Sequence, residues 1–200
     1  MARPLWLHSG GVVTTTSADC PATPHELSLE AIHEHHVDFV WSSLQRLGVP
    51  RADLEDALQE VFMVVHAKLT TFDGTSRVST WLFGICLRVA SGQRRKAYRH
   101  REHAVGNLEE TAGAVAAPSA EATLLEREAL QNLERVLDTL ELERRAVFVM
   151  FEIEGIGCPE IATLLGLPLG TVHSRLAAAR SDFAKAALRL RKQQEWSERR

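Results

Sequence analysis

Apolar side chains recur every three or four residues along most of this 200-residue chain, the spacing that predicts amphipathic helices. The first run covers 29–47 and ends where Gly48 interrupts it. A second run covers 54–69, and Asp53 precedes it in the position of a helix cap. A third, 80–101, begins apolar and aromatic and ends basic. No segment shows convincing period-two alternation, so the pattern predicts an all-α fold.

This periodicity lapses near the N-terminus and again in the middle of the chain. The first 25 or so residues are rich in Gly, Thr, Ser, Ala and Pro, and the middle segment is rich in alanine and glycine. Beyond it, 130–140 and 146–153 resume helical spacing. We therefore predict two small helical domains joined by a flexible linker, with a tail at 1–26, the first domain at 27–102, the linker at 103–122, the second domain at 123–194 and a short tail at 195–200.

The most informative segment, 159–176, reads as two short helices joined by a sharp turn. Ile161 lies on the inner face of the first helix, and Gly166 stands where a helix ends in the left-handed conformation. Val172 then resumes the apolar stripe. The opposite face, centred on Ser174, is short, polar and flanked by bases, as a helix that enters the DNA major groove requires. The same pattern also fits a helical hairpin that only completes a core.

The composition is that of an ordinary globular protein, with 45% hydrophobic and 24% charged residues and a formal net charge of −3. This balance argues against a protein that coats nucleic acid indiscriminately. No apolar run approaches the roughly 18 residues of a membrane span, and the N-terminus lacks the apolar core of a signal peptide. We therefore expect a cytoplasmic protein without membrane insertion. Cys20, Cys86 and Cys158 are far apart and form no CxxC pair, which indicates neither a disulfide framework nor a zinc site.

Charge is distributed unevenly along the chain. The helix predicted at 54–69 has an acidic face with no base of its own nearby, whereas positive residues gather in two other places. The first basic cluster comprises Arg88, Arg94, Arg95, Lys96, Arg99 and Arg101, and the second comprises Arg175, Arg180, Lys185, Arg189, Arg191 and Lys192. Two separate basic patches predict two DNA contacts, and the acidic face predicts a different, basic partner.

Two other classes of protein remain as alternatives. An enzyme would rely on His33 and His36, which share a helical face and offer two metal ligands, but no third ligand follows at helical spacing and no glycine-rich phosphate loop is present. We therefore predict no metal, no cofactor and no catalytic residue. A helix-turn-helix regulator that acts alone would need a sensory domain, and 27–101 shows no parallel-sheet pattern that would form one.

Two blocks of motifs stand on either side of the predicted linker. The first contains DLEDALQEVF at 53–62, then Phe72 and STWLFGI at 79–85. The second runs from 140–151 to EIA at 160–162, LGLP at 165–168 and GTVHSRL at 170–176. In this order and spacing, which together span about three quarters of the chain, they resemble the bacterial sigma factors of the sigma-70 superfamily, in the small two-domain extracytoplasmic-function (ECF) group.

This resemblance implies a subunit without catalytic activity that binds core RNA polymerase, reads the −35 and −10 promoter elements and helps to open DNA. An inhibitory anti-sigma factor is a further implied partner. Core polymerase would be bound through Asp53, Asp56, Gln59, Glu60 and Phe62. The −10 DNA would be bound through Phe72, Trp81, Arg88, Arg94, Arg95, Lys96 and Arg99, with Phe83 as a further aromatic candidate. The −35 DNA would be read by Thr171, His173, Ser174, Arg175 and Arg180. Core packing is the alternative role for the aromatic residues, and a solvated surface is the alternative for the charged ones.

The chain departs from the family pattern at several of these positions. Ala177 and Ala178 stand where many relatives have a base, and His173 replaces a common Arg or Lys. Leu87 and Arg88 replace a common Arg-Asn pair, so the −10 preference does not carry over in detail. We expect weaker or differently aimed −35 contacts and a larger share of promoter specificity from the first domain.

Overall fold

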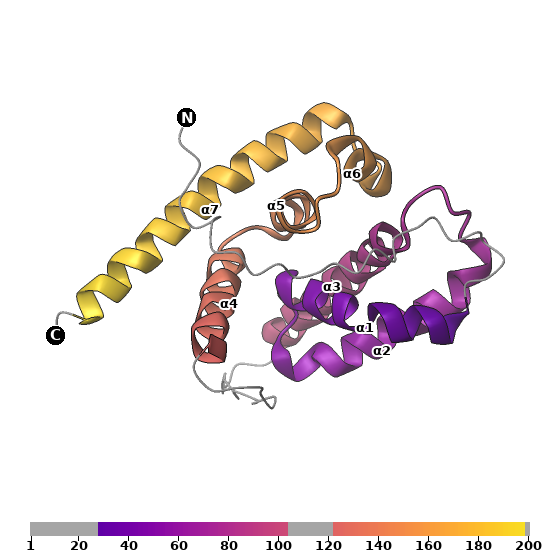
Figure 1. Cartoon of the computed structure of the whole chain (residues 1–200), viewed down its shortest axis with the longest axis horizontal. Helices are drawn as coiled ribbons and strands as arrows, with labels where there is room; N and C mark the ends of the chain where they lie inside the picture. The colour runs from indigo at the N-terminus through magenta and orange to yellow at the C-terminus, as the bar shows by residue number, and fades with distance from the viewer. Residues whose placement is uncertain (1–27, 104–121, 199–200) are drawn as a thin grey trace.

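The computed structural model describes residues 28–103 and 122–198, and within these ranges every regular element is helical (Figure 1). The predicted all-α fold is therefore confirmed for the described residues. The predicted N-terminal tail at 1–26 and nearly all of the predicted linker lie outside them. Within the described part of the chain, no helix is both long and apolar enough to cross a membrane.

The first domain consists of three helices, α1 (Leu29–Arg46), α2 (Leu54–Lys68) and α3 (Val78–His103), each packed against the other two. Ser28 caps α1 by accepting a hydrogen bond from the Ala31 N–H at 3.1 Å. Asp53 occupies the N-cap position of α2, but its side chain accepts no capping hydrogen bond. Asp53 therefore stands at the predicted cap position, but the expected capping hydrogen bond is not formed.

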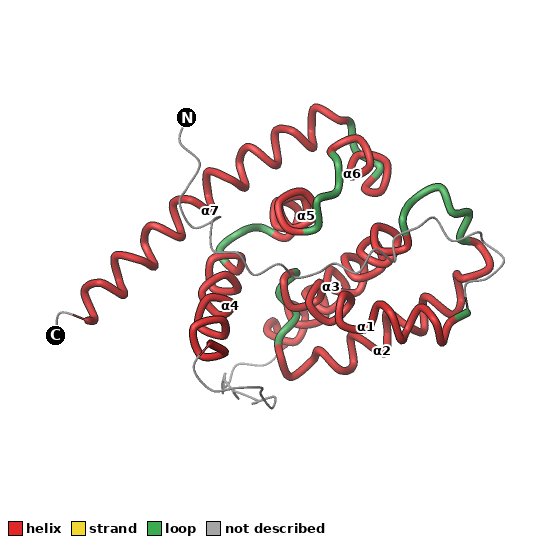
Figure 2. The backbone as a smooth tube through the Cα atoms, in the orientation of Figure 1, coloured by secondary structure: helices red, strands yellow, loops and turns green. Residues whose placement is uncertain are grey.

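The second domain contains four helices, α4 (Ala122–Asp138), α5 (Leu142–Phe148), α6 (Cys158–Leu165) and α7 (Leu169–Glu198). A π-helical turn, Val149–Ile153, continues α5, and Figure 2 shows the short loops that separate the helices. The 30 residues of α7 make it about 45 Å long at the usual helical rise. It extends through residues that the sequence analysis assigned to the C-terminal tail.

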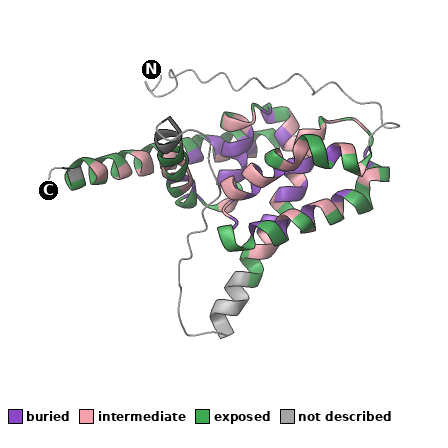
Figure 3. Ribbon diagram, turned by 60° about the horizontal axis from the view of Figure 1, so that its bottom comes forward, coloured by how far each residue is buried: buried purple, intermediate pink, exposed green. Residues whose placement is uncertain are grey.

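The two domains pack against each other and share one continuous cluster of buried apolar residues (Figure 3). Helix α4 contacts α1, and α6 contacts α3. At the second of these contacts, the side chain of Leu164 lies against Gly84, where a Cβ would come within 2.9 Å of Leu164 Cδ1. Nothing in the hydrophobic pattern had indicated that the two domains meet.

Candidate nucleic-acid and protein interfaces

The acidic face predicted on α2 exists and is open to solvent. Asp53, Asp56 and Gln59 are exposed along it, and Leu54, Ala57, Val61 and Val65 are buried on the opposite face. Met63 lies one turn after Gln59 with 71% of its surface exposed. The exposed face thus combines carboxylates with one flexible apolar side chain, and methionine is a residue enriched at protein–protein contacts.

Glu60 differs from the other acidic residues of α2 because it has partners on α3. Its Oε2 accepts a hydrogen bond from Gln93 Nε2 at 3.3 Å and lies 3.8 Å from Lys96 Nζ. The expectation that no base lies near this acidic face was therefore wrong at Glu60. This carboxylate connects the first domain's acidic and basic surfaces.

Phe62 and the histidines of α1 form a packed edge beside the acidic face. The Phe62 ring lies 4.6 Å from the ring of His33, measured between centroids. His36 approaches Phe39 edge-on at 6.5 Å, and His35 donates a hydrogen bond from Nδ1 to Ala31 O at 2.8 Å. Among the residues that the structure describes, no three His, Cys, Asp or Glu side chains gather where they could hold a metal ion.

The aromatic residues considered for the −10 contact lie at different depths. Phe83 is completely buried, so the alternative of core packing is correct for it. Phe72 is 8% exposed and packs against Trp81, with the two ring centroids 5.0 Å apart. Trp81 is half-buried. Of the three rings, that of Trp81 is the most accessible to an unstacked base.

The basic cluster of α3 follows this aromatic pair along the same helix. Arg88, Arg94, Arg95 and Lys96 are all exposed. Arg99 lies on α3 too, but its side chain is outside the described residues. Trp81, Gly84, Arg88 and Arg95 follow steps of three, four and seven residues, which place them along one stripe of the helix. The structure therefore aligns the aromatic and basic candidates for the −10 contact.

The predicted helix-turn-helix is formed by α6, a short turn and the start of α7. Gly166 ends α6 in the left-handed conformation with φ +63°, and the Leu167 N–H donates to Ala162 O at 3.0 Å. Val172 and Leu176 of α7 are buried, as predicted. One face of α7 remains open beside this buried stripe.

Residues on the open face of α7 include most of the −35 candidates. His173 and Ser174 are exposed and Thr171 is half-buried. The Ser174 hydroxyl donates a hydrogen bond to Thr171 O at 2.9 Å, which leaves its oxygen able to accept. Ala177 is exposed beside them and adds no polar group. The face is polar but sparsely charged, as the sequence predicted.

Both arginines predicted to contact −35 DNA are ion-paired to the preceding helix and turn. Arg175 pairs with Glu143 of α5. Arg180 donates from Nε to Glu152 at 2.6 Å, and its guanidinium lies 5.1 Å from the centroid of the Phe151 ring. Sequence analysis missed these carboxylates because only the fold brings α5 alongside α7. The pairs hold two long side chains in defined positions on α7.

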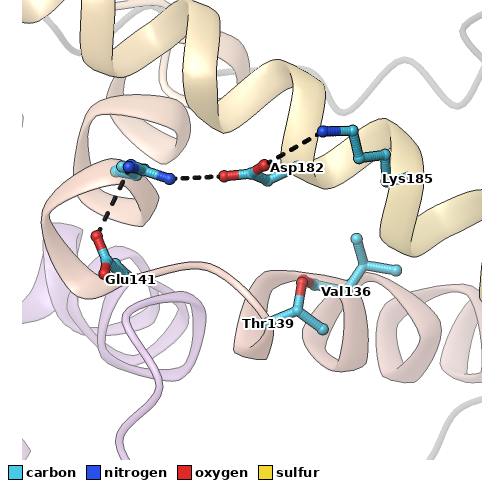
Figure 4. A network of polar contacts seen from close by, with 6 residues as sticks. Val136, Thr139, Glu141, Asp182 and Lys185 are labelled. Atoms are coloured by element: carbon cyan, nitrogen blue, oxygen red, sulfur yellow. Dashed lines mark hydrogen bonds and ion pairs between the residues drawn. The ribbon is translucent and has the colours of Figure 1, made fainter.

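A second network of polar contacts joins α7 to α5 beyond Arg180 (Figure 4). Arg144 donates to Asp182 at 2.8 Å and lies 3.7 Å from Glu141, while Lys185 lies 4.0 Å from Asp182. Below them the Phe148 and Phe183 rings stack with centroids 4.6 Å apart. These contacts set the direction in which α7 projects from α5.

The two cysteines among the described residues, Cys86 and Cys158, take no part in these surfaces. Burial raises the pKa of the Cys86 thiol to about 12, and Cys158 is buried as well. A thiol with such a pKa stays protonated and is a poor nucleophile. Cys20 lies outside the described residues.

Comparison with known proteins gives two matches to family models. The model for sigma-70 region 2 matches residues 32–100, and the model for sigma-70 region 4 matches residues 130–183. The first match covers the part of the chain that carries the acidic face and the −10 candidates. The second contains the helix-turn-helix and ends near the middle of α7.

Individual relatives agree with this pair of matches. The chain is 30% identical over 145 residues to the ECF RNA polymerase sigma-E factor of Escherichia coli K12, which covers 70% of this chain and 76% of the relative. It is 28% identical over 151 residues to the RNA polymerase sigma factor NccH of Alcaligenes xylosoxydans xylosoxydans, covering 75% and 81% of the two chains.

Solved structures show the same fold. The sigma factor RpoE from Bartonella quintana, in complex with the anti-sigma factor NepR, matches with a TM-score of 0.65 and 22% identity, covering 78% of this chain and 94% of that one. CnrH in complex with the cytosolic domain of CnrY matches with a TM-score of 0.55 and 25% identity over 78% and 85% of the two chains. With both sigma-70 regions present in order, the chain belongs to the ECF group of sigma-70 family sigma factors, which direct transcription initiation as non-catalytic subunits of RNA polymerase.

Proposed function

We propose that this sigma factor makes its three contacts through three different surfaces. Its first domain spans 27–102 and its second spans 123–194. The acidic face of α2 binds core polymerase, the stripe on α3 binds the −10 element, and the open face of α7 reads the −35 element. The observation that supports this assignment is that the aromatic and basic stripe of α3 and the open face of α7 lie on different domains, while the acidic face lies on α2 and meets the basic residues of α3 at Glu60.

Asp56 and Gln59 form the centre of the proposed polymerase contact. Both are exposed on α2, so they meet a basic partner without rearrangement. Asp53 and Phe62 lie at the edges of this contact. Glu60 contributes less, because its carboxylate already interacts with Lys96 and Gln93. An exposed carboxylate favours a basic partner mainly by steering and by specificity, since the rim charges of an interface add little affinity.

Trp81 and Phe72 carry the proposed melting step at the −10 element. An unstacked base gains roughly 1 to 3 kcal/mol by stacking on an aromatic side chain, which offsets the cost of leaving the duplex. Phe72 supports Trp81 from beneath in this arrangement. The exposed bases Arg88, Arg94, Arg95 and Lys96, together with Arg99, then hold the phosphates of the separated strand, and this contact makes binding dependent on salt.

The open face of α7 carries the proposed −35 contact. Thr171, His173 and Ser174 stand at the start of the helix, where a recognition helix presents side chains to base edges. Arg175 and Arg180 flank them, each held by a carboxylate that DNA phosphates would replace. With alanines at 177 and 178, base reading depends on few side chains and the helix serves largely to position the chain on the duplex.

An anti-sigma factor is the proposed inhibitory partner. The support comes from the solved structures of similar fold, since RpoE is bound to NepR and CnrH is bound to the cytosolic domain of CnrY. A cytoplasmic location accompanies this proposal because core polymerase and the promoter have to be reached there.

Reconstitution tests the proposal. Core RNA polymerase supplied with this chain should start transcription at promoters mapped from transcript starts after overexpression, and a chain that fails to bind core polymerase would refute the assignment. Asp56→Lys should weaken core binding more than Glu60→Lys does, because Glu60 is already paired. Glu128→Lys, at an exposed position on α4 of the second domain, makes the same change in charge and serves as the matched control.

A further inference from the structure

The C-terminal half of α7 carries a basic stripe that none of the three proposed surfaces includes. The match to sigma-70 region 4 ends at residue 183, but α7 continues to Glu198. Lys185, Arg189 and Lys192 are exposed on this extension. They follow one another at steps of four and three residues, so they lie on one side of the helix. Figure 1 shows this half of α7 projecting away from α6.

The stripe continues the open face of α7 that is proposed to read the −35 element. Ser174 and Lys192 are separated by about five complete turns at 3.6 residues per turn, so both side chains leave the helix in the same direction. Lys185 lies within about 20° of that direction, because it follows Ser174 by about three turns. At the usual helical rise it stands about 16 Å further along the axis than Ser174.

The positive charge of this face is therefore displaced toward the C-terminus. Ala177, Ala178 and Ser181 add no charge to the first turns, and the bases of the face begin only at Lys185. The major groove of DNA is about 12 Å wide, so a helix that places Ser174 in the groove carries Lys185 past the groove's edge, where the phosphates lie. The stripe supplies, outside the groove, the anchoring charge that the first turns lack.

Two bases of the stripe are available to an outside anion. Arg189 and Lys192 form no ion pair within the described part of the chain, whereas carboxylates of α5 and the π-helical turn hold the two arginines proposed for the −35 contact. Lys185 lies 4.0 Å from Asp182, and such a pair at the surface is weak because water screens it. DNA phosphates can therefore engage Arg189 and Lys192 without breaking an existing pair.

We propose that Lys185, Arg189 and Lys192 form a phosphate-binding stripe, against which the duplex beside the −35 element lies while the first turns of α7 occupy the groove. This proposal rests on the proposed −35 face. The stripe reads no bases, so it adds affinity and fixes the orientation of α7 on DNA of any sequence. An acidic protein is the other partner that a row of bases attracts, but continuity with the −35 face favours DNA.

Two neighbouring arginines on opposite sides of α7 test the stripe. Arg189→Gln removes a base from the stripe. Arg191→Gln removes the same charge about 200° around the helix, where Arg191 pairs with Glu195, and is the matched control. The full-length chain, without polymerase, is titrated against a fluorescein-labelled duplex of random sequence, roughly 30 base pairs long, over a range of salt concentrations. Fluorescence anisotropy measures the affinity.

A phosphate contact changes both the affinity and its dependence on salt. Arg189→Gln should make the slope of log affinity against log salt less steep by about 0.9 and should weaken binding roughly fivefold to tenfold near 0.1 M salt. Adding Lys192→Gln to the same chain should about double the change in slope. Arg191→Gln should leave the slope close to that of wild type. Circular dichroism checks that each variant is folded.

Three outcomes would overturn the stripe. Equal losses in Arg189→Gln and Arg191→Gln would mean that only net charge matters. A wild-type slope in the double variant would mean that the bases serve an acidic protein instead, and failure of wild type to bind the duplex would exclude a phosphate contact. Because the probe has a random sequence and polymerase is absent, failed promoter initiation or lost base discrimination would contradict the proposed function without changing these results.

Discussion

The two surfaces of this sigma factor that are proposed to contact DNA are built in opposite ways. The −35 surface on α7 is open, and carboxylates of the preceding helix and turn hold its arginines in place. The proposed −10 surface on α3 depends on the packed, tilted pair Phe72 and Trp81, and α6 of the other domain stands against it at Gly84. Ion pairs position the side chains of one surface, and aromatic packing positions those of the other.

This difference fits the DNA that each surface meets. A duplex element is read by side chains that are already oriented, since preorganised groups lose less entropy when they bind. An element that has to be melted is engaged later, by a surface that holds an unstacked base and the phosphates of a single strand. The exposed basic residues of α3 and the half-buried Trp81 suit that second step.

The largest expected effect comes from a substitution at Gly48, where the absence of a side chain leaves room for Arg145 between the domains. Gly48→Ala meets both an unfavourable positive φ and a collision with Arg145 Nη1, and we expect a loss of about 2 to 5 kcal/mol in the free energy of unfolding. Gly155→Ala is the matched control, because Gly155 also has a positive φ but a Cβ there meets nothing within 4 Å. Chemical denaturation compares the two, and equal losses would mean that the Arg145 contact contributes nothing.

The next largest effect is expected at Trp81, on the proposed −10 surface of α3. Trp81→Ala should reduce open-complex formation by roughly tenfold to a hundredfold, because one stacked base is worth about 1 to 3 kcal/mol. Trp81→Phe keeps a ring and should lose much less. Permanganate reactivity of unpaired thymines on a cognate promoter measures melting directly. If Trp81→Ala melts DNA normally, Trp81 has only a packing role against Phe72.

On the −35 surface the two arginines should separate into different roles. Arg175→Ala should reduce discrimination between bases by about 1 to 3 kcal/mol if it reads a base edge, while Arg180→Ala should lower the salt dependence of binding by about one phosphate contact. Fluorescence anisotropy over a range of salt measures both. Lys68→Ala, at an exposed position on α2 of the other domain, is the control and should change neither.

The smallest expected effect is the pH dependence contributed by Glu154. Burial raises its pKa, and the attraction of Arg46 offsets that shift only in part. The short ion pair is thus less stabilising than its 2.6 Å distance suggests, because dehydration of the carboxylate opposes it. A raised pKa in the folded state means that the folded protein binds the proton more tightly, so this contribution to stability is lost as pH rises through the raised pKa.

Glu154→Gln removes this titration while it keeps the shape of the side chain. The difference in free energy of unfolding between wild type and Glu154→Gln should therefore move against wild type as pH rises from about 5 to about 8. Urea denaturation at several pH values measures the difference. A difference that moves in favour of wild type over this range would show that the pair with Arg46 outweighs the burial of Glu154.

Local patterns predicted much of the fold. The helical spacing, the left-handed Gly166 and the buried stripe of Val172 and Leu176 follow from periodicity and from the conformations that glycine permits. Phe83 shows where such patterns are insufficient, because an aromatic residue beside Trp81 could equally face solvent or the core. Its complete burial depends on which neighbouring helices cover that side of α3.

The sequence by itself determined the two helical blocks, the acidic and basic clusters and the motifs that place the chain in its family. Tertiary structure alone decided which charges are paired, since Arg46 and Glu154 are 108 positions apart and the local spacing around Arg145 resembles that of a solvated helix face. It also decided that the two domains meet on α3. The physical reason is that periodicity records which side of a helix is apolar, whereas the partner of a side chain depends on how distant helices pack.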